Sequence, residues 1–228
     1  MGSKHWSPFK PILQLFLTAP CPGCDRPISR TLCATCEQQL QQCALAKPAA
    51  TWRGSLPLFA WGRYEGKLRQ AIAALKYHNH PQLADDLGNR MAKSWRTQSL
   101  SRNLCSPPIV VPVPLHPARA QERGYNQAAL LARAFCQRIQ LPLAEQGLSR
   151  CRATEAQFGL SASARQQNLA GAFQLCDRWQ RHPPQRPVLL LDDIYTTGST
   201  VQAAAQTLRS ASISVIGTVV LARAIKAD

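Results

Sequence analysis

The chain has 228 residues, of which 45% are hydrophobic and 17% charged, so it can bury one sizeable core and lacks the composition of a disordered protein. Its 27 lysines and arginines against 12 acidic residues give a formal net charge of +15. This charge favours polyanions such as nucleic acid, phosphorylated metabolites or anionic lipid head groups, although a basic protein without a polyanionic partner stays an alternative.

The sequence of the amino-terminal segment does not predict a membrane anchor or a secretory signal. No apolar run in the chain reaches the roughly 20 residues that a membrane-spanning helix needs, so we expect no membrane span. The short apolar stretch Ile12–Leu17 is also shorter than the apolar core of a signal peptide, about 7–15 residues. We therefore expect a lead-in that packs on the domain, in a cytoplasmic protein.

The next feature is a cluster of cysteines in the sequence CPGCDRPISRTLCATC. It contains two C-x2-C pairs with eight residues between them: Cys21, Cys24, Cys33 and Cys36. Each pair presents two thiolates from a tight turn, and the short spacer lets the pairs converge on one tetrahedral Zn²⁺. Pro22 and Gly23 suit the first turn, because proline fixes φ and glycine is permissive. A structural zinc ion would supply much of the folding energy of so small a module.

Two alternatives to zinc are a pair of disulfides and a redox-active pair. Stable disulfides are not expected in a reducing cytosol, and redox C-x2-C motifs belong next to a βαβ pattern that is absent here. The remaining five cysteines are scattered and indicate ordinary buried or half-buried residues, with Cys43 a less favoured substitute ligand.

The segment 46–57 has the composition of a short linker, and the hydrophobic pattern changes after it. We therefore expect two parts, a zinc-ribbon module with its lead-in over residues 1–50 and a second domain over residues 51–228.

The second domain alternates predicted strands with predicted helices. Apolar runs predict strands at 56–65, 109–114, 188–191 and 213–223, and helical spacing of apolar residues predicts helices at 66–78, 82–98, 126–140 and 199–211. This alternation is typical of βαβ units, so we predict an α/β fold with a mainly parallel sheet covered by helices on both faces. Ligands of such sheets bind at the carboxyl ends of the strands.

At the carboxyl end of the third predicted strand, VLLLDDIYTTGST brings acids, hydroxyls and a glycine together. Asp192 and Asp193 should emerge where the strand ends, and Ser199 should cap the next helix, with Gln202 completing a capping box. A phosphate in the loop 195–198 would meet backbone N–H groups and a helix amino end. The two carboxylates would repel that phosphate but could accept hydrogen bonds from sugar hydroxyls, so we infer a ribose 5-phosphate ligand. A capped helix with an incidental acid pair is the alternative.

These residues resemble the ribosyl-phosphate loop of the type I phosphoribosyltransferases. With LKYH (75–78), VPVPLHPARAQERGYNQAALLA (111–132) and RATEAQFGLSASARQQNLAGAF (152–173) behind a cysteine cluster, nearly the whole chain is similar to the ComF family. That family includes a late-competence DNA-uptake protein and a protein once linked to gluconate utilisation. The resemblance implies a type I phosphoribosyltransferase-like fold with an attached zinc ribbon.

The resemblance also implies a ligand, phosphoribosyl pyrophosphate bound with Mg²⁺, and a site for it. Asp192 and Asp193 would take the ribose 2- and 3-hydroxyls. The 5-phosphate would lie in the cradle formed by five successive residues: Thr196, Thr197, Gly198, Ser199 and Thr200. Three basic residues match positions of the family that would contact pyrophosphate: Lys76, Arg119 and Arg123, the last two in a loop resembling a mobile flap.

Each of these basic residues has a simpler alternative. Lys76 could be a cation at a helix carboxyl end, where the helix dipole favours it, and either arginine could belong to a solvated basic face. His116 could act as an acid or base, although a histidine with its hydrogen bonds satisfied in the loop is favoured. Four further residues match the family pattern without a physical role that we can assign: Thr154, Gln157, Arg165 and Asn168.

Two functional hypotheses follow. The first is a phosphoribosyltransferase-like protein that acts in DNA uptake or utilisation. This hypothesis leaves open whether the protein also transfers the phosphoribosyl group to a nitrogen acceptor, which the sequence does not identify. The second is a non-enzymatic adaptor that binds single-stranded DNA through the zinc module and the basic surface, with DNA-uptake proteins as partners. Many relatives carry further cysteine pairs, whereas the segment 43–46 keeps only Cys43, so we predict a single zinc ion.

Overall fold

The structure is a computed structural model that describes residues 19–28, 30–98, 100, 106–151 and 171–225. The predicted lead-in over residues 1–18 therefore lies outside the described residues, as do Thr154, Gln157, Arg165 and Asn168. Within the described ranges, no helix has both the length and the apolar composition to cross a membrane.

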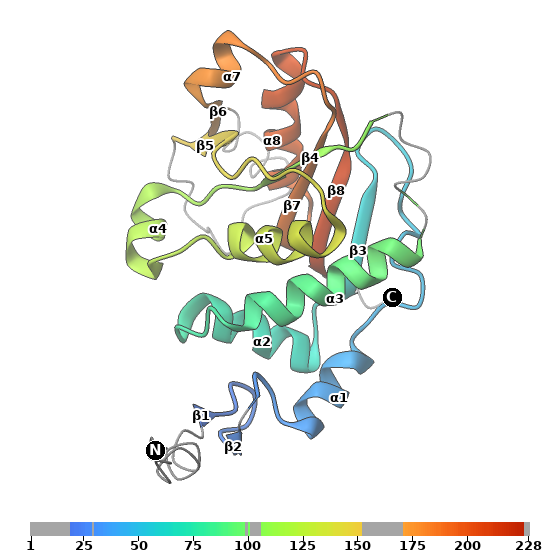
Figure 1. Cartoon of the computed structure of the whole chain (residues 1–228), viewed down its shortest axis with the longest axis vertical. Coiled ribbons are helices and arrows are strands. Elements are labelled where there is room, and N and C mark those ends of the chain that lie inside the picture. The colour runs from blue at the N-terminus through green and yellow to red at the C-terminus, as the bar shows by residue number, and fades with distance from the viewer. Residues whose placement is uncertain (1–18, 29, 99, 101–105, 152–170, 226–228) are drawn as a thin grey trace, which may run out of the picture.

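Helices and strands alternate along most of the chain (Figure 1). The helices are α1 (Ala34–Gln42), α2 (Gly66–Tyr77), α3 (Leu83–Thr97), α4 (Pro117–Arg123), α5 (Gln127–Ile139), α7 (Asp177–Arg181) and α8 (Ser199–Ser210). The strands are β1 (Ala19–Pro20), β2 (Pro27–Ile28), β3 (Leu58–Arg63), β4 (Ile109–Pro112), β5 (Leu148–Arg150), β6 (Phe173–Leu175), β7 (Val188–Tyr195) and β8 (Val215–Arg223).

The central feature is a sheet with the strand order β3-β8-β7-β4, in which every neighbouring pair is parallel. Two antiparallel pairs accompany it, β1 with β2 in the cysteine segment and β5 with β6 beside α7. The α/β class and the parallel sheet predicted from the sequence are confirmed.

Helices cover both faces of this sheet, as predicted. Successive side chains of a strand point to opposite faces, so the buried run of β7 supplies two cores. Leu189 and Leu191 pack in one core with residues of α2, α3 and α5. Val188 and Leu190 pack in the other with α8, β5, β6 and α7. A strand buried on both faces explains why its sequence is continuously apolar rather than alternating.

One predicted loop is a helix. The segment that follows β4, predicted as a flap-like loop carrying Arg119 and Arg123, forms α4. Pro117 opens the helix, and the Nδ1 atom of His116 accepts a hydrogen bond from the N–H of Ala118 at 3.3 Å. Proline after a capping side chain is a helix start signal that the loop prediction overlooked. His116 therefore has the satisfied role that was favoured for it.

The segment 46–57 is packed against the sheet. Thr51 forms an antiparallel bridge with Leu58, and the Trp52 ring contacts the Trp95 ring edge-on with 5.1 Å between the ring centres. Trp52 also lies over Gly217 of β8, where an added Cβ would come within 2.6 Å of its ring. These contacts tie the predicted linker to the second domain, while the domain boundary at residue 50 stays a prediction.

Candidate ribose-phosphate site and cysteine cluster

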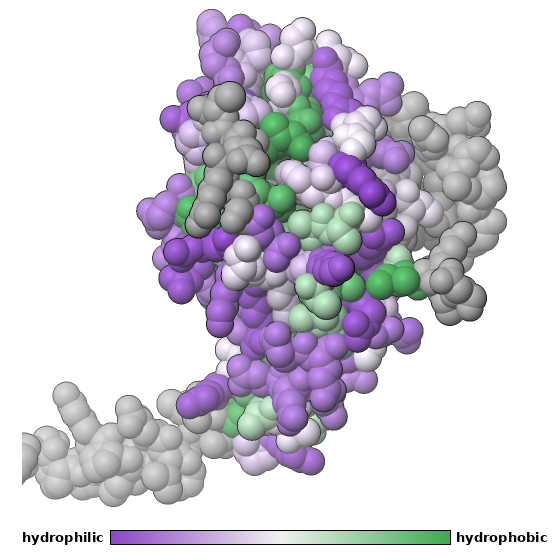
Figure 2. Space-filling view, turned by 90° about the vertical axis from the view of Figure 1, so that its right-hand side faces the viewer, coloured by the Kyte–Doolittle hydropathy of each residue, from purple (hydrophilic) through white to green (hydrophobic). Residues whose placement is uncertain are grey.

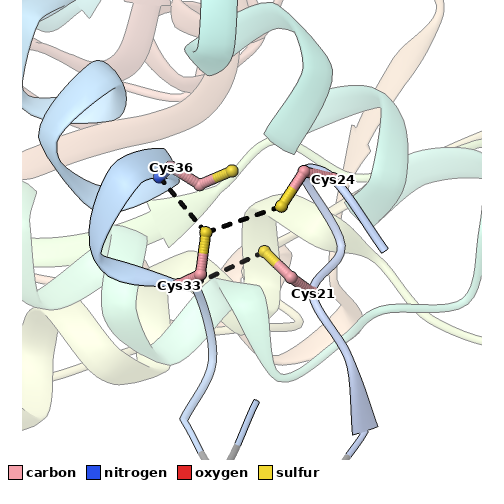
Figure 3. A group of neighbouring side chains, drawn as sticks. All are labelled: Cys21, Cys24, Cys33 and Cys36. Carbon is pink, nitrogen blue, oxygen red and sulfur yellow. Dashed lines mark hydrogen bonds between the residues drawn. The ribbon is translucent and has the colours of Figure 1, made fainter. Parts of the chain in front are cut away.

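The four cysteines of the two C-x2-C pairs lie together, as their spacing predicts. Their Sγ atoms all lie within 4.8 Å of one another, and Figure 3 shows the side chains converging from the β1–β2 turn and the start of α1. A tetrahedral zinc ion with Zn–S bonds of about 2.3 Å places its sulfur ligands roughly 3.8 Å apart. The 3.5 Å between the sulfurs of Cys24 and Cys33 is close to that spacing. The cluster therefore fits a tetrahedral zinc ion.

Backbone groups around the cluster favour thiolates. The N–H of Cys33 donates to Cys21 Sγ at 3.4 Å, and the N–H of Cys36 donates to Cys33 Sγ at the same distance. The second bond is the main reason why the pKa of Cys33 is lowered to about 6, whereas burial raises the pKa of Cys36 to about 12. Because Zn²⁺ binds the thiolate form, metal binding at this cluster would release thiol protons.

The turn that carries Cys21 and Cys24 has no room for a side chain at Gly23. A Cβ at this position would lie 2.9 Å from Cys36 Sγ, so a larger residue would push into the cluster. The Gly23 carbonyl accepts a hydrogen bond of 2.9 Å from Lys67 Nζ, which joins the turn to α2. Cys43 is buried apart from the cluster, and its thiol donates weakly to the Gln39 carbonyl oxygen at 3.5 Å.

The two acids of the loop motif lie inside β7 rather than beyond its end. The strand continues to Tyr195, because residues through Tyr195 still pair with β8. Asp192 is 8% exposed and Asp193 is 4% exposed. The prediction that both acids emerge where the strand ends at Leu191 was therefore wrong, and parallel pairing on the β8 side is the reason.

A lysine from α2 neutralises one of these acids. Lys76 Nζ lies 2.6 Å from Asp193 Oδ2, and both side chains are largely buried. Burial alone would lower the pKa of Lys76, but the charge of Asp193, its hydrogen bond and the charge of Asp192 outweigh burial and raise that pKa. Lys76 is thus a charged ammonium group tied to the acid pair from the last turn of α2.

For Asp192, burial outweighs the nearby positive charge, so its pKa favours the neutral form. Burial raises its pKa well above the usual range, and the neighbouring charge of Asp193 raises it further. The N–H of Asp193, which donates to Asp192 Oδ1 at 2.8 Å, and the more distant charge of Lys76 only partly oppose this. The pair therefore tends to carry one negative charge rather than two, with a hydrogen-bonding carboxyl group beside it.

The loop after β7 places its hydroxyls at the amino end of α8. The helix cap is Gly198, with a φ of 78°, which has no side chain to cap the helix, and the N–H of Ser199 donates to Thr197 Oγ1 at 3.4 Å. The predicted cap by Ser199 was wrong: Ser199 is the first helical residue, and its Oγ lies 3.0 Å from Thr197 Oγ1. Thr196 and Thr197 precede the cap, and Ser199 and Thr200 begin the helix, so a bound anion would meet N–H groups at a helix amino end.

A pocket of about 620 Å³ lies between the end of α2 and α4. Its lining includes all three basic residues proposed to contact pyrophosphate: Lys76, Arg119 and Arg123. Since Lys76 also pairs with Asp193, the pocket borders the acid pair. The structure therefore brings these residues, which are far apart in the sequence, to one place.

A further cation, Arg150 of β5, was not singled out from the sequence. Burial lowers the pKa of Arg150, as does the positive charge of Arg119, while the charge of Asp192 opposes both. Its guanidinium group also lies 5.6 Å from the ring centre of Phe173 on β6. The strands β5 and β6, which pair antiparallel, are too short to give a periodic signal, so the sequence did not indicate that Arg150 lies near enough to interact with Asp192.

Solved structures with some likeness to this chain include two hypoxanthine phosphoribosyltransferases. The enzyme from Trypanosoma cruzi is 18% identical over 63% of this chain and 66% of its own, with a TM-score of 0.38. The Staphylococcus aureus enzyme is 15% identical over 63% of this chain and 70% of its own, also with a TM-score of 0.38. Both scores are too low to bear on function.

No protein-family model matches the chain, but individual relatives do. DNA utilization protein YhgH of Escherichia coli K12 is 31% identical over 82% of this chain and 77% of its own length. Competence protein ComFC of Bacillus subtilis is 23% identical over 85% and 75%. Competence protein F of Haemophilus influenzae is 32% identical over 210 residues, which cover 90% of each protein. The chain therefore belongs to the competence protein F, or ComF, family.

Proposed function

We propose that this protein binds phosphoribosyl pyrophosphate at the carboxyl edge of β7 and acts, in the cytoplasm, in DNA uptake or utilisation. The acid pair carries this proposal. Asp192 and Asp193 lie near the end of β7, ahead of a loop of hydroxyls and N–H groups. Lys76 pairs with Asp193, and the α4 arginines line the same pocket as Lys76. The names of the relatives, competence protein and DNA utilization protein, support the cellular context.

Each group has a role in this proposal. The carboxyl groups of Asp192 and Asp193 accept hydrogen bonds from the ribose hydroxyls, and the loop Thr196–Thr200 with the start of α8 holds the 5-phosphate. The pocket between α2 and α4 takes the diphosphate, which arrives as its Mg²⁺ complex. If transfer occurs, the bond from the ribose carbon to the diphosphate breaks as a nitrogen acceptor bonds to that carbon, and the basic residues stabilise the departing pyrophosphate.

Calorimetric titration tests the ligand. Phosphoribosyl pyrophosphate with Mg²⁺ should bind the purified protein with micromolar affinity, and the Asp192→Asn/Asp193→Asn variant should lose that binding. Asp177→Asn serves as the matched control, because Asp177 lies on α7 outside this site. Absence of binding to the unmodified protein would refute the proposal. A screen of nucleobases and other amines for pyrophosphate release would then decide whether the protein is a transferase.

We also propose that the cysteine cluster holds one structural zinc ion. The sulfur geometry and the small size of the module support this. Metal analysis should find one zinc per chain, and Cys21→Ser should lower that content. Cys43→Ser is the matched control, because it removes a buried thiol outside the cluster. Equal zinc content in both variants would count against the cluster as the site.

A second candidate function is binding of single-stranded DNA. The protein could bind DNA without being an enzyme, or it could bind both DNA and phosphoribosyl pyrophosphate. The net charge of +15 favours it, and hydrophilic residues cover most of the face shown in Figure 2. Binding to an oligonucleotide should weaken steeply as salt rises, because each neutralised phosphate releases counterions. Absent or salt-insensitive binding would exclude this candidate.

A further inference from the structure

The helix α4 carries two basic residues of the pocket, yet it contributes no residue to the hydrophobic cores of the described part of the chain. None of its seven residues is buried. Among the residues that the structure describes, the contacts that hold it lie at its two ends. At its amino end His116 caps the helix, and at its carboxyl end the sequence Arg123-Gly124-Tyr125-Asn126-Gln127 leads into α5.

After Gly124 ends the helix, two residues of this segment join it to other elements. Gly124 ends α4 with a φ of 80°, in the left-handed region that glycine adopts without strain. The Tyr125 hydroxyl donates to the Leu75 carbonyl oxygen of α2 at 2.6 Å. Asn126 donates through Nδ2 to the Val113 carbonyl oxygen after β4 at 3.1 Å, and its Oδ1 caps α5 by accepting from the N–H of Ala128 at 3.0 Å.

Arg123 and Gln127 make the remaining contacts of this segment. The Arg123 guanidinium lies 5.4 Å from the ring centre of Tyr77, at the end of α2, and its Nη1 donates to Gln127 Oε1. Gln127 is only 5% exposed, so it is a fixed anchor. Tyr77 is 72% exposed, so burial does not explain the position of its ring, whereas the contact with Arg123 does.

The two arginines of α4 therefore differ. Arg119 and Arg123 are four residues apart and share one face of the helix, so fixing one positions the other. Arg123 is engaged by Tyr77 and Gln127, whereas Arg119 is exposed and its charge reaches Arg150. An engaged guanidinium between an aromatic ring and a buried amide suits an anchor better than a ligand contact.

We propose that Arg123 is a positioning residue, which with Tyr77 and Gln127 fastens α4 to the end of α2, and that Arg119 is the arginine so presented to a diphosphate. The assignment of Arg119 rests on the proposed function, and the fastening of α4 does not. The five residues 123–127 then form one mechanical joint, with Lys76 and Arg119 as the cations that contact the ligand.

Hydrogen exchange of the ligand-free protein tests the fastening. Tyr77→Ala should speed exchange of the amides of α4 by roughly two- to fivefold, the loss expected for an exposed cation–π contact. Tyr77→Phe should leave that exchange unchanged, because it keeps the ring. Arg119→Ala is the matched control on the same helix and should also leave it unchanged. Equal exchange in Tyr77→Ala and the unmodified protein would overturn the fastening.

Calorimetry with two ligands then separates the arginines. Arg123→Ala should weaken binding of phosphoribosyl pyrophosphate by about tenfold, because the displaced Arg119 loses its charged hydrogen bond to the diphosphate. Binding of ribose 5-phosphate, which has no diphosphate, should be spared. Adding Tyr77→Ala to Arg123→Ala, or to Arg119→Ala, should cost nothing more, because the fastening affects the affinity only through Arg119.

Two results would overturn this division of roles. If Tyr77→Ala leaves the affinity for phosphoribosyl pyrophosphate unchanged while Arg123→Ala lowers it, Arg123 contacts the ligand directly. If the unmodified protein binds ribose 5-phosphate no more weakly than phosphoribosyl pyrophosphate, the pocket holds no diphosphate and the assignment of Arg119 fails. Failure of both ligands to bind would refute the proposed function, and the exchange experiment would still decide the fastening.

Discussion

Single residues of the acid pair have unequal electrostatic roles. Asp193 shares its buried surroundings with the Lys76 ammonium group, whereas burial and the charge of Asp193 favour the protonated form of Asp192. The same two-letter motif, DD, therefore contains one acid that serves as a counterion and one that tends toward neutrality. This difference leads to two predictions.

The first prediction concerns amide replacements. Asp193→Asn should lower the free energy of unfolding by about 3–5 kcal/mol, because it leaves Lys76 buried without its counterion. Asp192→Asn should not lower it by more than about 1 kcal/mol, since an amide oxygen can still accept the N–H of Asp193 and the amide carries no buried charge. Urea unfolding at pH 7 measures both. Equal losses in the two variants would contradict the asymmetry.

The second prediction concerns pH. Because the folded state raises the pKa of Asp192, it binds this proton more tightly than the unfolded state does. The contribution of Asp192 to stability is therefore full at low pH and is lost as pH rises from about 4, the usual value for an aspartate, through the raised folded pKa. Asp192→Asn should remove this downward slope. Urea unfolding at a series of pH values compares the two proteins, and parallel curves would refute the assignment.

The sequence could indicate the chemistry of these residues but not their surroundings. Two acids followed by hydroxyls and Gly198 indicated a ribose 5-phosphate site, because each group suits one part of that ligand. Nothing near residue 192 in the sequence reveals that Lys76 reaches Asp193, or that Arg150 lies near enough to affect Asp192, since both come from other elements. Burial and long-range charge depend on the folded arrangement.

At the level of elements, long periodic segments were predictable and short ones were not. The stripe of Leu83, Leu87, Met91 and Trp95 gave α3 to within one residue at each end. By contrast, α4, α7, β5 and β6 span seven residues or fewer, too short for a period to be evident. Local capping and tertiary contacts define such elements instead.

The amino end of α8 gives a prediction at this scale. Gly198→Ala should destabilise the protein, because φ at 198 is positive and the new Cβ would run into the Tyr195 ring. Gly171→Ala is the matched control: φ there is also positive, at 70°, but no atom of the described residues lies within 4 Å of the added carbon. We expect about 1–2 kcal/mol for Gly171→Ala from the backbone. Gly198→Ala should cost at least about 1 kcal/mol more through the clash, and equal losses in urea unfolding would exclude it.

The whole molecule combines its two predicted parts through a shared core. Cys21, Cys36 and Leu40 are buried in the same cluster as Leu68 and Ile72 of α2. Arg90 of α3 also reaches α1, donating to Glu37 at 3.1 Å and to Gln41 at 3.1 Å. The sequence indicated a boundary near residue 50 because composition and pattern change there, but it could not reveal these contacts between distant segments.

This shared core leads to a prediction about cooperativity. The zinc-loaded protein should unfold in a single calorimetric transition, because melting of the cysteine module would expose the α2 side of the main core. Zinc removal by a chelator should lower the temperature of that transition rather than add a separate one. Scanning calorimetry before and after chelation measures this. Two resolved transitions in the zinc-loaded protein would show that the parts unfold independently.

The helix α2 meets the cysteine turn at one end through Lys67 and the acid pair at the other through Lys76. A helix rises about 1.5 Å per residue, so these two lysines are spaced by roughly 14 Å along its axis. Inserting or deleting one residue between them would turn one lysine by about 100° relative to the other and break one of the two contacts. Many substitutions on the exposed side of α2 should therefore be neutral, while any change in its length would separate the cysteine turn from the ribose site.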